Sequence, residues 1–336
     1  AMEILSQNPV SIWVNETPEK TPMNVFVCDY ETTWENKMIE LILGGKRLDV
    51  VTMRGGDFCK RLKSTLEEKT KAKILILYGG CDNSEFTTDP NAKWVEFDVI
   101  IRSQTINAGV DFNVPHFHSV FVDIGSYGAN SDDVLQSMRR SRNLLDASYY
   151  LLFKKCTRYD RPITEMAVID SETMKINHNV RSDLKEFRGR TVDNGFKFRD
   201  VDDKLFRAFV HYIAYRNSKT NNIFNDIIFG LREMGANFEF ITMKSKEDDF
   251  KSAERIRLSY EKIRSKSNKD IANARDIEDY EYANIGKYTK HTEADKAEMD
   301  KYMLRQTYRY YGEIDEEWVK KYRERDVIKL ARNIYL

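Results

Sequence analysis

Short apolar runs alternate with amphipathic stretches through the first 155 residues of the chain. The apolar runs are nearly continuous and rich in valine, isoleucine and aromatic residues, which predicts buried β-strands. Between them, apolar residues recur at helical spacing, and Gly44-Gly45 ends the first predicted helix, which Thr32 or Thr33 can cap. A parallel sheet covered by helices on both faces has this pattern. We therefore predict an α/β domain with strands at 23–30, 47–55, 72–80, 94–105 and 118–126 and helices at 32–43 and 57–71.

The pattern changes after Cys156. Residues 157–200 mix short β-like pieces, such as MAVID at 166–170, with polar turns. From residue 201 onward helical spacing dominates, one helix ends at Gly235, and Thr292 with Asp295 forms a capping-box pattern. We expect a leading segment or linker at 1–22, the α/β domain at 23–156, a mixed connecting segment at 157–200 and an all-helical accessory domain at 201–336.

The composition is that of a soluble globular protein, with 41% hydrophobic and 32% charged residues. Lysine plus arginine equals aspartate plus glutamate, at 54 each, so the net charge identifies no partner. A nucleic-acid-binding protein with this balance must concentrate its positive charge on one face. No apolar run approaches the roughly 18 residues of a membrane span, and the chain starts without a signal-peptide core. Four scattered cysteines are typical of reduced thiols in an intracellular protein.

Three arginines stand close together in DDVLQSMRRSRNLL at 132–145. Arginine keeps its charge in proteins, so a cluster set in an apolar frame needs anions nearby. We predict a helix capped by Ser131 or Asp132, at the edge where parallel strands end and ligands gather. The anion is either a phosphate or the protein's own carboxylates, as on an exposed basic helix. The residues predicted to share one side of this helix are Gln136, Arg139, Arg140 and Asn143, with Arg142 in the same cluster.

A second stretch, DVIIRSQTINAGVDF at 98–112, runs from a hydrophobic strand into a turn of small residues. Small residues let backbone N–H groups approach a ligand, and Thr105 can donate a hydrogen bond to a phosphate oxygen. Asp111 is either a ligand-binding residue or an ordinary turn or cap residue. His116 and His118 lack a third ligand, so we expect them to be structural and predict no metal site.

Together these stretches resemble motifs V and VI of superfamily two helicases, and they look most like the herpesvirus origin-binding protein and its relatives in large DNA viruses. The order of a strand, TINAGVDF, HFHSVFVDIGSYG and VLQSMRRSRNLL carries the resemblance, and VFVCDYETT at 25–33 stands where the family has motif IV. The family's motif VI reads Gln-Ser-Met/Leu-Gly-Arg-x-Arg, and Arg139 replaces its glycine here. The resemblance covers about residues 20–155, while NIFNDIIFGLREMGANF and EIDEEWVKKY resemble helical extensions of such helicases more weakly.

The resemblance implies a RecA-like fold for 23–156, with ATP and Mg²⁺ clamped between this domain and a second RecA-like domain. The sequence contains no G-x-x-x-x-G-K-[S/T] phosphate loop, so we expect the second domain to precede these residues in a longer polypeptide. The arginine finger, which meets the γ-phosphate, would be Arg140 or Arg142. The remaining residues implied at the nucleotide site are Gln136, Arg139, Gly109 and Asp111, the last through the ribose or through an arginine. Those implied to contact the DNA backbone are Thr105, Thr32 and Thr33.

Three hypotheses for the function follow from the resemblance. The first is the C-terminal part of an ATP-dependent DNA helicase of viral-type DNA replication, acting inside the host cell. Its partners would be single-stranded DNA, the missing N-terminal domain, and other replication proteins or a second copy. The alternatives are a non-catalytic DNA-binding scaffold that recruits partners, and a translocase on duplex DNA. The basic segment 251–269 either lines a DNA path or pairs with the acidic stretch 276–282.

Overall fold

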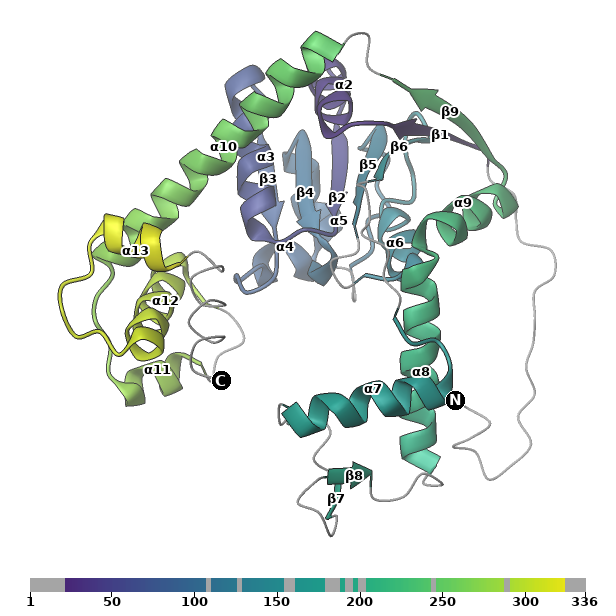
Figure 1. Cartoon of the computed structure of the whole chain (residues 1–336). Helices are drawn as coiled ribbons and strands as arrows, with labels where there is room; N and C mark the ends of the chain where they lie inside the picture. Colours follow the sequence, from purple (N-terminus) through teal and green to yellow (C-terminus); the bar gives the residue numbers. More distant parts are fainter. Residues whose placement is uncertain are drawn as a thin grey trace.

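A seven-stranded parallel sheet forms the centre of the protein, in the order β3-β4-β2-β5-β6-β1-β9 (Figure 1). The computed structural model describes residues 22–106, 110–125, 129–153, 161–178, 188–190, 196–198, 204–242, 246–286 and 291–323. Every pair of neighbouring strands in this sheet is parallel. The strands are β1 (Met23–Cys28), β2 (Leu48–Thr52), β3 (Ile74–Leu77), β4 (Val99–Ser103), β5 (Ser119–Ile124), β6 (Ser148–Phe153) and β9 (Ala236–Ile241). The predicted parallel sheet is therefore confirmed.

Helices cover both faces of the sheet, as the near-continuous apolar strands predict. On one face α2 (Glu31–Leu43) and α3 (Gly56–Lys69) pack against alternate strand residues. On the other face α6 (Ser131–Met138) and α9 (Ile223–Glu233) pack against the intervening ones. Trp34 shows how tightly the first layer is joined, because its buried indole N–H donates to the Tyr150 carbonyl at 3.0 Å. The short helices beside β3 and β4 are α4 (Ser84–Thr88), α5 (Pro90–Lys93), η1 (Trp94–Glu96) and η2 (Gln104–Ile106).

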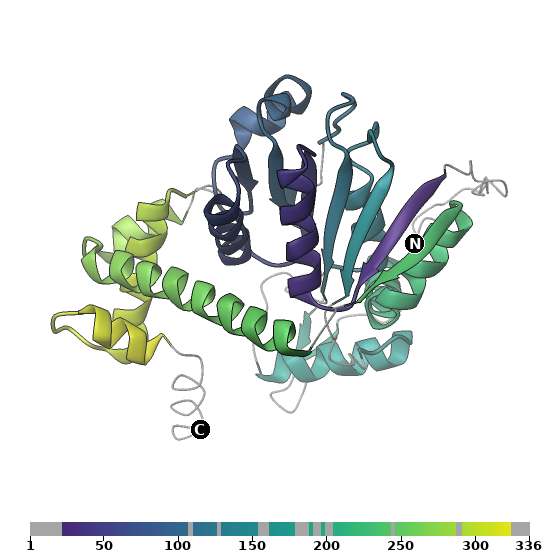
Figure 2. The same ribbon diagram turned by 90° about the horizontal axis from the view of Figure 1, so that it is seen from above.

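Two helical units extend from the sheet (Figures 1 and 2). The first is an arm of α7 (Glu165–His178) and α8 (Lys204–Asn221), accompanied by the antiparallel pair β7 (Arg188–Arg190) and β8 (Phe196–Phe198). The second begins with the long helix α10 (Lys246–Asn273), which contacts α2 and α3. It continues through α11 (Asp279–Ile285), α12 (Glu293–Tyr308) and α13 (Glu316–Tyr322), and α12 and α13 share a small apolar core with α10.

Residues 201–336 are mainly helical, as expected, but the prediction that this region is entirely helical is wrong. β9 lies in this region and completes the central sheet beside β1, and α9 packs on that sheet. Residue 200 is therefore not a boundary between the sheet and a separate domain. The β-like piece MAVID is also helical, since residues 166–170 lie within α7. Residues 1–21, and most of the predicted connecting segment 157–200, lie outside the described residues.

No helix among the described residues is long and apolar enough to cross a membrane.

Candidate functional site

The helix that precedes the arginine cluster is shorter than predicted. The N-cap of α6 is Asn130, whose side chain forms a capping box with Asp133, so the predicted caps Ser131 and Asp132 are first-turn residues. The helix ends at Met138, before the arginines. Residues 139–142, which we call the arginine turn, run alongside Phe112, whose N–H donates to the Arg140 carbonyl at 2.9 Å. The prediction that the cluster shares one helical face is therefore wrong.

A buried ion pair explains why the helix stops there. Arg102 on β4 and Asp49 on β2 are both fully buried, and the guanidinium binds the carboxylate through two contacts of 2.9 and 2.8 Å. Arg102 also donates to the Ser137 carbonyl at the end of α6, at 2.8 Å. The Ser141 hydroxyl donates to Asp49, also at 2.8 Å. These bonds replace the next helical turn and fix the arginine turn to the sheet.

The arginine turn and the end of α6 line a pocket of about 650 Å³, which we call the arginine pocket. It brings together four of the predicted residues, Gln136, Arg139, Arg140 and Arg142, with Met23, Leu135, Ser141, Tyr149 and Met234. The Arg142 Nε lies 2.8 Å from Asp111 Oδ1, so Asp111 has one of its two predicted partners. The Arg140 Nε is buried and has no hydrogen-bond partner among the described residues. Three arginines thus line the pocket, and among the described residues only Arg142 is paired with a carboxylate, an arrangement that suits an anion.

The arginine pocket lies at the amino ends of the strands. The prediction that the arginine cluster lies at their carboxyl ends is therefore wrong. Met23 opens β1, Tyr149 stands at the start of β6, and Met234 precedes β9. The reason is the direction of α6, which begins after the carboxyl end of β5 and runs back across the sheet. Its last residues are therefore carried to the opposite edge. Gly109 lies outside the described residues, so its role stays a prediction.

The three threonines predicted to contact DNA lie at the carboxyl edge instead. Thr105, in η2 directly after β4, shares a hydrogen bond of 2.7 Å with Ser103. A Cβ added to Gly79 would lie 3.0 Å from the Thr105 side chain, so a larger residue there would require Thr105 to give by a few tenths of an ångström. Thr32 and Thr33 lie inside the first turn of α2 and do not cap it, because Tyr30 is the N-cap residue. Both are buried, and Thr33 donates to Asp29 at 2.8 Å, which leaves little surface for a direct DNA contact.

A second pocket, of about 450 Å³, opens at this carboxyl edge, and we call it the carboxyl-edge pocket. Its lining combines residues after β2 and β3 with residues from α10 and α12, and it comprises Arg54, Gly55, Gly56, Asp57, Phe58, Lys60, Tyr78, Gly79, Tyr260 and Lys296. Lys60 and Lys296 both bind the Glu293 carboxylate. A Cβ at Gly56 would lie 2.5 Å from the Tyr78 ring, so the pocket requires glycine there. The sequence did not single out these cations.

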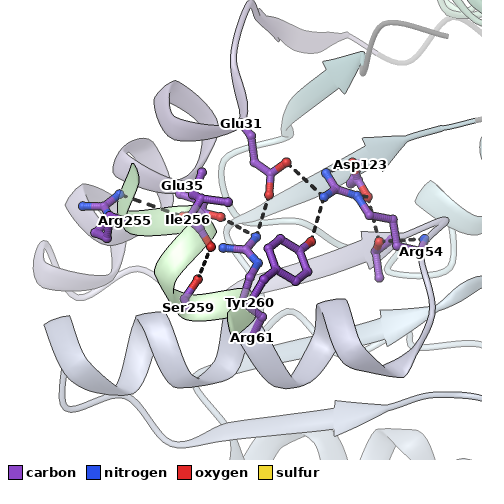
Figure 3. Close-up of polar contacts among 10 residues, drawn as sticks. Glu31, Glu35, Arg54, Arg61, Asp123, Arg255, Ile256, Ser259 and Tyr260 are labelled. Atoms are coloured by element: carbon purple, nitrogen blue, oxygen red, sulfur yellow. Dashed lines mark hydrogen bonds and ion pairs between the residues drawn. The ribbon is translucent and has the colours of Figure 1, made fainter. Parts of the chain in front are cut away.

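A buried network joins α10 to the sheet beside this pocket (Figure 3). Arg54 forms a two-point contact with Asp123, at 2.8 and 2.7 Å, and also reaches Glu31 at 2.9 Å. The Tyr260 hydroxyl of α10 accepts a hydrogen bond from Arg54 at 3.2 Å. Arg54 thereby contacts Asp123 of β5, Glu31 of α2 and Tyr260 of α10, so the long helix is tied to the end of the sheet.

The same network continues between α2, α3 and α10. Arg61 reaches Glu31 at 2.7 Å and Glu35 at 2.6 Å, and Arg255 of α10 lies 3.9 Å from Glu35. Burial raises the pKa of the Glu35 carboxyl, against the opposing effect of Arg61. The carboxylates of Glu31, Glu35 and Asp123 are thus balanced by three guanidinium groups, and α10 supplies the third of these through Arg255. We call the whole cluster the α10 latch; its members are Glu31, Glu35, Arg54, Arg61, Asp123, Arg255 and Tyr260.

The two histidines flanking Phe117 have structural roles, as expected. His116 Nε2 lies 2.8 Å from the Phe97 carbonyl, and His118 accepts a hydrogen bond from the Arg47 N–H at 3.0 Å. Burial lowers the pKa of both rings. Within the described part of the chain, no group of three or more His, Cys, Asp or Glu side chains is arranged to hold a metal ion.

Comparisons with known proteins identify similar sequences and folds. A model of the family described as "Origin of replication binding protein" matches residues 57–316. The replication origin-binding protein of Human herpesvirus 6A (strain Uganda-1102) is 26% identical over 151 residues, which is 42% of this chain and 18% of that protein. The chain therefore matches less than a fifth of the length of this curated relative.

Solved structures of helicases are similar at lower identity. Domain 2 of the DEAD-box helicase Mss116p, bound to an RNA duplex, is 14% identical, with 65% of this chain and 98% of that chain covered and a TM-score of 0.32. The yeast DEAD-box splicing factor Prp28 is 15% identical, with 51% and 38% covered and a TM-score of 0.34. These scores are too low to add to what the strand order already shows.

Proposed function

The chain belongs to the family of origin of replication binding proteins, and from that premise we propose that it is the second motor domain, with helical extensions, of an ATP-dependent DNA helicase that acts in viral-type DNA replication inside the host cell. The observation that carries the proposal is the arginine pocket, which Gln136 and three arginines line beside a turn fixed by a buried ion pair; among the described residues only Arg142 is paired with a carboxylate. Such fixed positive charge stabilises the negative charge that develops during phosphoryl transfer.

The contacts in the arginine pocket support a division of roles between its arginines. Arg142 is 61% exposed and already paired with Asp111, while Arg140 has a buried Nε that lacks a partner among the described residues. We assign Arg140 as the finger that meets the γ-phosphate. When nucleotide binds, Arg142 leaves Asp111 and contacts the phosphates instead. Arg139 and Gln136 line the nucleotide side of the pocket.

ATP and Mg²⁺ would be shared with a second RecA-like domain. The sequence contains no phosphate loop of the kind that holds the β- and γ-phosphates in such motors, so we assign that loop to the other domain. Bound Mg²⁺ would neutralise charge on the phosphates. The residues of this chain would then hold the γ-phosphate from the opposite side and align it for attack by water.

Single-stranded DNA is the proposed partner of the carboxyl-edge pocket. Lys60 and Lys296 supply two cations there that share one carboxylate, Glu293, and Thr105 stands beside Gly79, which also lines the pocket. Contacts of this kind are made with the DNA backbone and do not depend on sequence, so binding should weaken steeply with salt. Other replication proteins, or a second copy of the chain, are further proposed partners.

The test uses a protein that contains both motor domains. Arg140→Ala is expected to lower DNA-stimulated ATP turnover by about 10³-fold, the effect typical of a lost arginine finger. Arg257→Ala, an exposed arginine on α10, is the matched control and should leave turnover unchanged. DNA binding, measured by fluorescence anisotropy, should persist in both variants. Unchanged turnover in Arg140→Ala and Arg142→Ala would contradict the motor and favour the non-catalytic scaffold.

A further inference from the structure

The outer face of α8 carries exposed positive and aromatic side chains without any acidic residue. Over its 18 residues the helix contains four lysines or arginines and no aspartate or glutamate. Its inner face, formed by Phe206, Val210 and Ala214, packs against Val168 of α7. On another side of the helix, helical spacing places residues 204, 207, 211 and 215 along one stripe, and their side chains are exposed.

This stripe mixes cations with aromatic rings. Tyr212 and Tyr215 are 53% and 49% exposed, and Lys204, Arg207 and His211 are exposed beside them. We call these five residues the α8 stripe. Residues 204 to 215 extend over about 16 Å at 1.5 Å per residue, which is enough for several nucleotides.

Acidic residues reach only part of the α8 stripe. The Tyr215 hydroxyl donates to Asp132 at 2.6 Å, and His211 lies 3.5 Å from Glu165. Among the residues that the structure describes, no ion pair engages Lys204 or Arg207. Within the described part of the chain, the outer end of the stripe therefore carries two cations that no carboxylate engages.

The inner end of the stripe lies at the carboxyl edge of the sheet. Asp132, which holds Tyr215, belongs to the first turn of α6, and α6 starts just after the carboxyl end of β5. From there α8 projects away from the sheet (Figures 1 and 2). A strand bound along this edge would meet the α8 stripe where it leaves the sheet.

We propose that the α8 stripe binds single-stranded nucleic acid, with phosphates on Lys204 and Arg207 and bases stacked on Tyr212 and Tyr215. The inference rests on the proposed DNA-dependent function and extends it to an element outside the sheet. Rings interleaved with cations favour this ligand over an acidic peptide, because bases stack on tyrosine while carboxylates do not.

The experiment measures binding of fluorescein-labelled oligo(dT) to the whole chain by anisotropy at several salt concentrations. Tyr212→Ala should weaken binding at least about fivefold through lost stacking, and Tyr212→Phe should restore it. Arg207→Ala should lower the slope of log K against log salt by about 0.7, the value for one phosphate contact of a single strand. The matched controls are Tyr280→Ala and Lys320→Ala, an exposed tyrosine on α11 and an exposed lysine on α13, which should bind like wild type.

The outcomes separate this inference from the proposed function. If Lys60→Ala in the carboxyl-edge pocket weakens binding but Tyr212→Ala and Arg207→Ala do not, the α8 stripe is no DNA site and the proposed function stands. If the wild-type chain does not bind oligo(dT), both fail. If polyglutamate binds the wild-type chain, and Arg207→Ala weakens that binding while the affinity for oligo(dT) is unchanged, the stripe takes an acidic peptide and the inference is wrong.

Discussion

The buried pair Asp49–Arg102 offers a direct test of how the arginine turn is held. Replacing Asp49 with leucine removes the carboxylate and leaves the guanidinium of Arg102 fully buried without its counter-ion. Breaking a buried pair from one side in this way typically costs about 3–5 kcal/mol. The Ser141 hydroxyl also loses its acceptor, which places the expected loss toward the upper end of that range.

The double variant Asp49→Leu/Arg102→Met separates the pair from its surroundings. Two apolar side chains of similar volume remove the unpaired charge, so we expect the double variant to be destabilised by only about 1–2 kcal/mol. The arginine turn nevertheless loses its bond to Asp49, and the end of α6 loses its bond to Arg102. Its backbone should therefore open more often, although the sheet remains folded.

Urea unfolding followed by circular dichroism measures the first effect. With an m-value of about 3 kcal/mol/M, the single variant should unfold at a midpoint about 1 to 2 M lower than wild type. Limited trypsin digestion measures the second, since trypsin should cut the arginine turn of the double variant faster than that of wild type. A single variant as stable as the double one, or equal cleavage of the turn, would refute this account of the anchor.

Three further predictions concern the edges of the fold. Burial raises the pKa of Glu293, but hydrogen bonds from its lysine partners lower it more, to about 2 from 4.5. The stability that the ionised carboxylate contributes is therefore complete above pH 4.5 and is lost as the pH falls towards 2. The difference in urea midpoint between wild type and Glu293→Gln should vanish over that window. Gly235→Ala should cost about 1 kcal/mol in unfolding free energy because φ is 90° at this position, whereas Gly44→Ala, with φ of −77°, should cost less. Tyr260→Phe removes the acceptor for Arg54, and hydrogen exchange of α10 should speed up about fivefold, for a loss of about 1 kcal/mol.

Local patterns predicted the parts of the fold that local physics decides. The first five strands, the helices α2 and α3, the glycine after α9 and the capping box at Thr292 all follow from short-range spacing. β9 was missed because ANFEFI lies among helices and alternates polar with apolar residues, so only its pairing with β1 makes it a strand of this sheet. MAVID is helical because Val168 packs against Phe206 of α8, a contact that no local pattern contains.

In the candidate site, too, some features follow from neighbouring residues in the sequence and others from distant contacts. Gln136 and the arginines meet in one pocket because they are near neighbours in sequence. The end of α6 and the position of that pocket depend on Arg102, which is distant in sequence and was not singled out. A signal existed, since Asp49 and Arg102 are charged residues within otherwise apolar strands, and such residues need a buried partner. Which partner each takes depends on the strand order, which the sequence pattern does not contain.

The outermost strand has a consequence for synthesis of the protein. β1 ends at Cys28, yet the strand that covers its flank begins only at Ala236. A nascent chain emerging from the ribosome must therefore carry β1 with one row of backbone amides and carbonyls uncovered until translation has passed β9. Chains truncated before that point end the sheet in the apolar strand MNVFVC, whereas longer chains end it in β9, which carries the exposed Asn237 and Glu239; the truncated chains should therefore aggregate more readily.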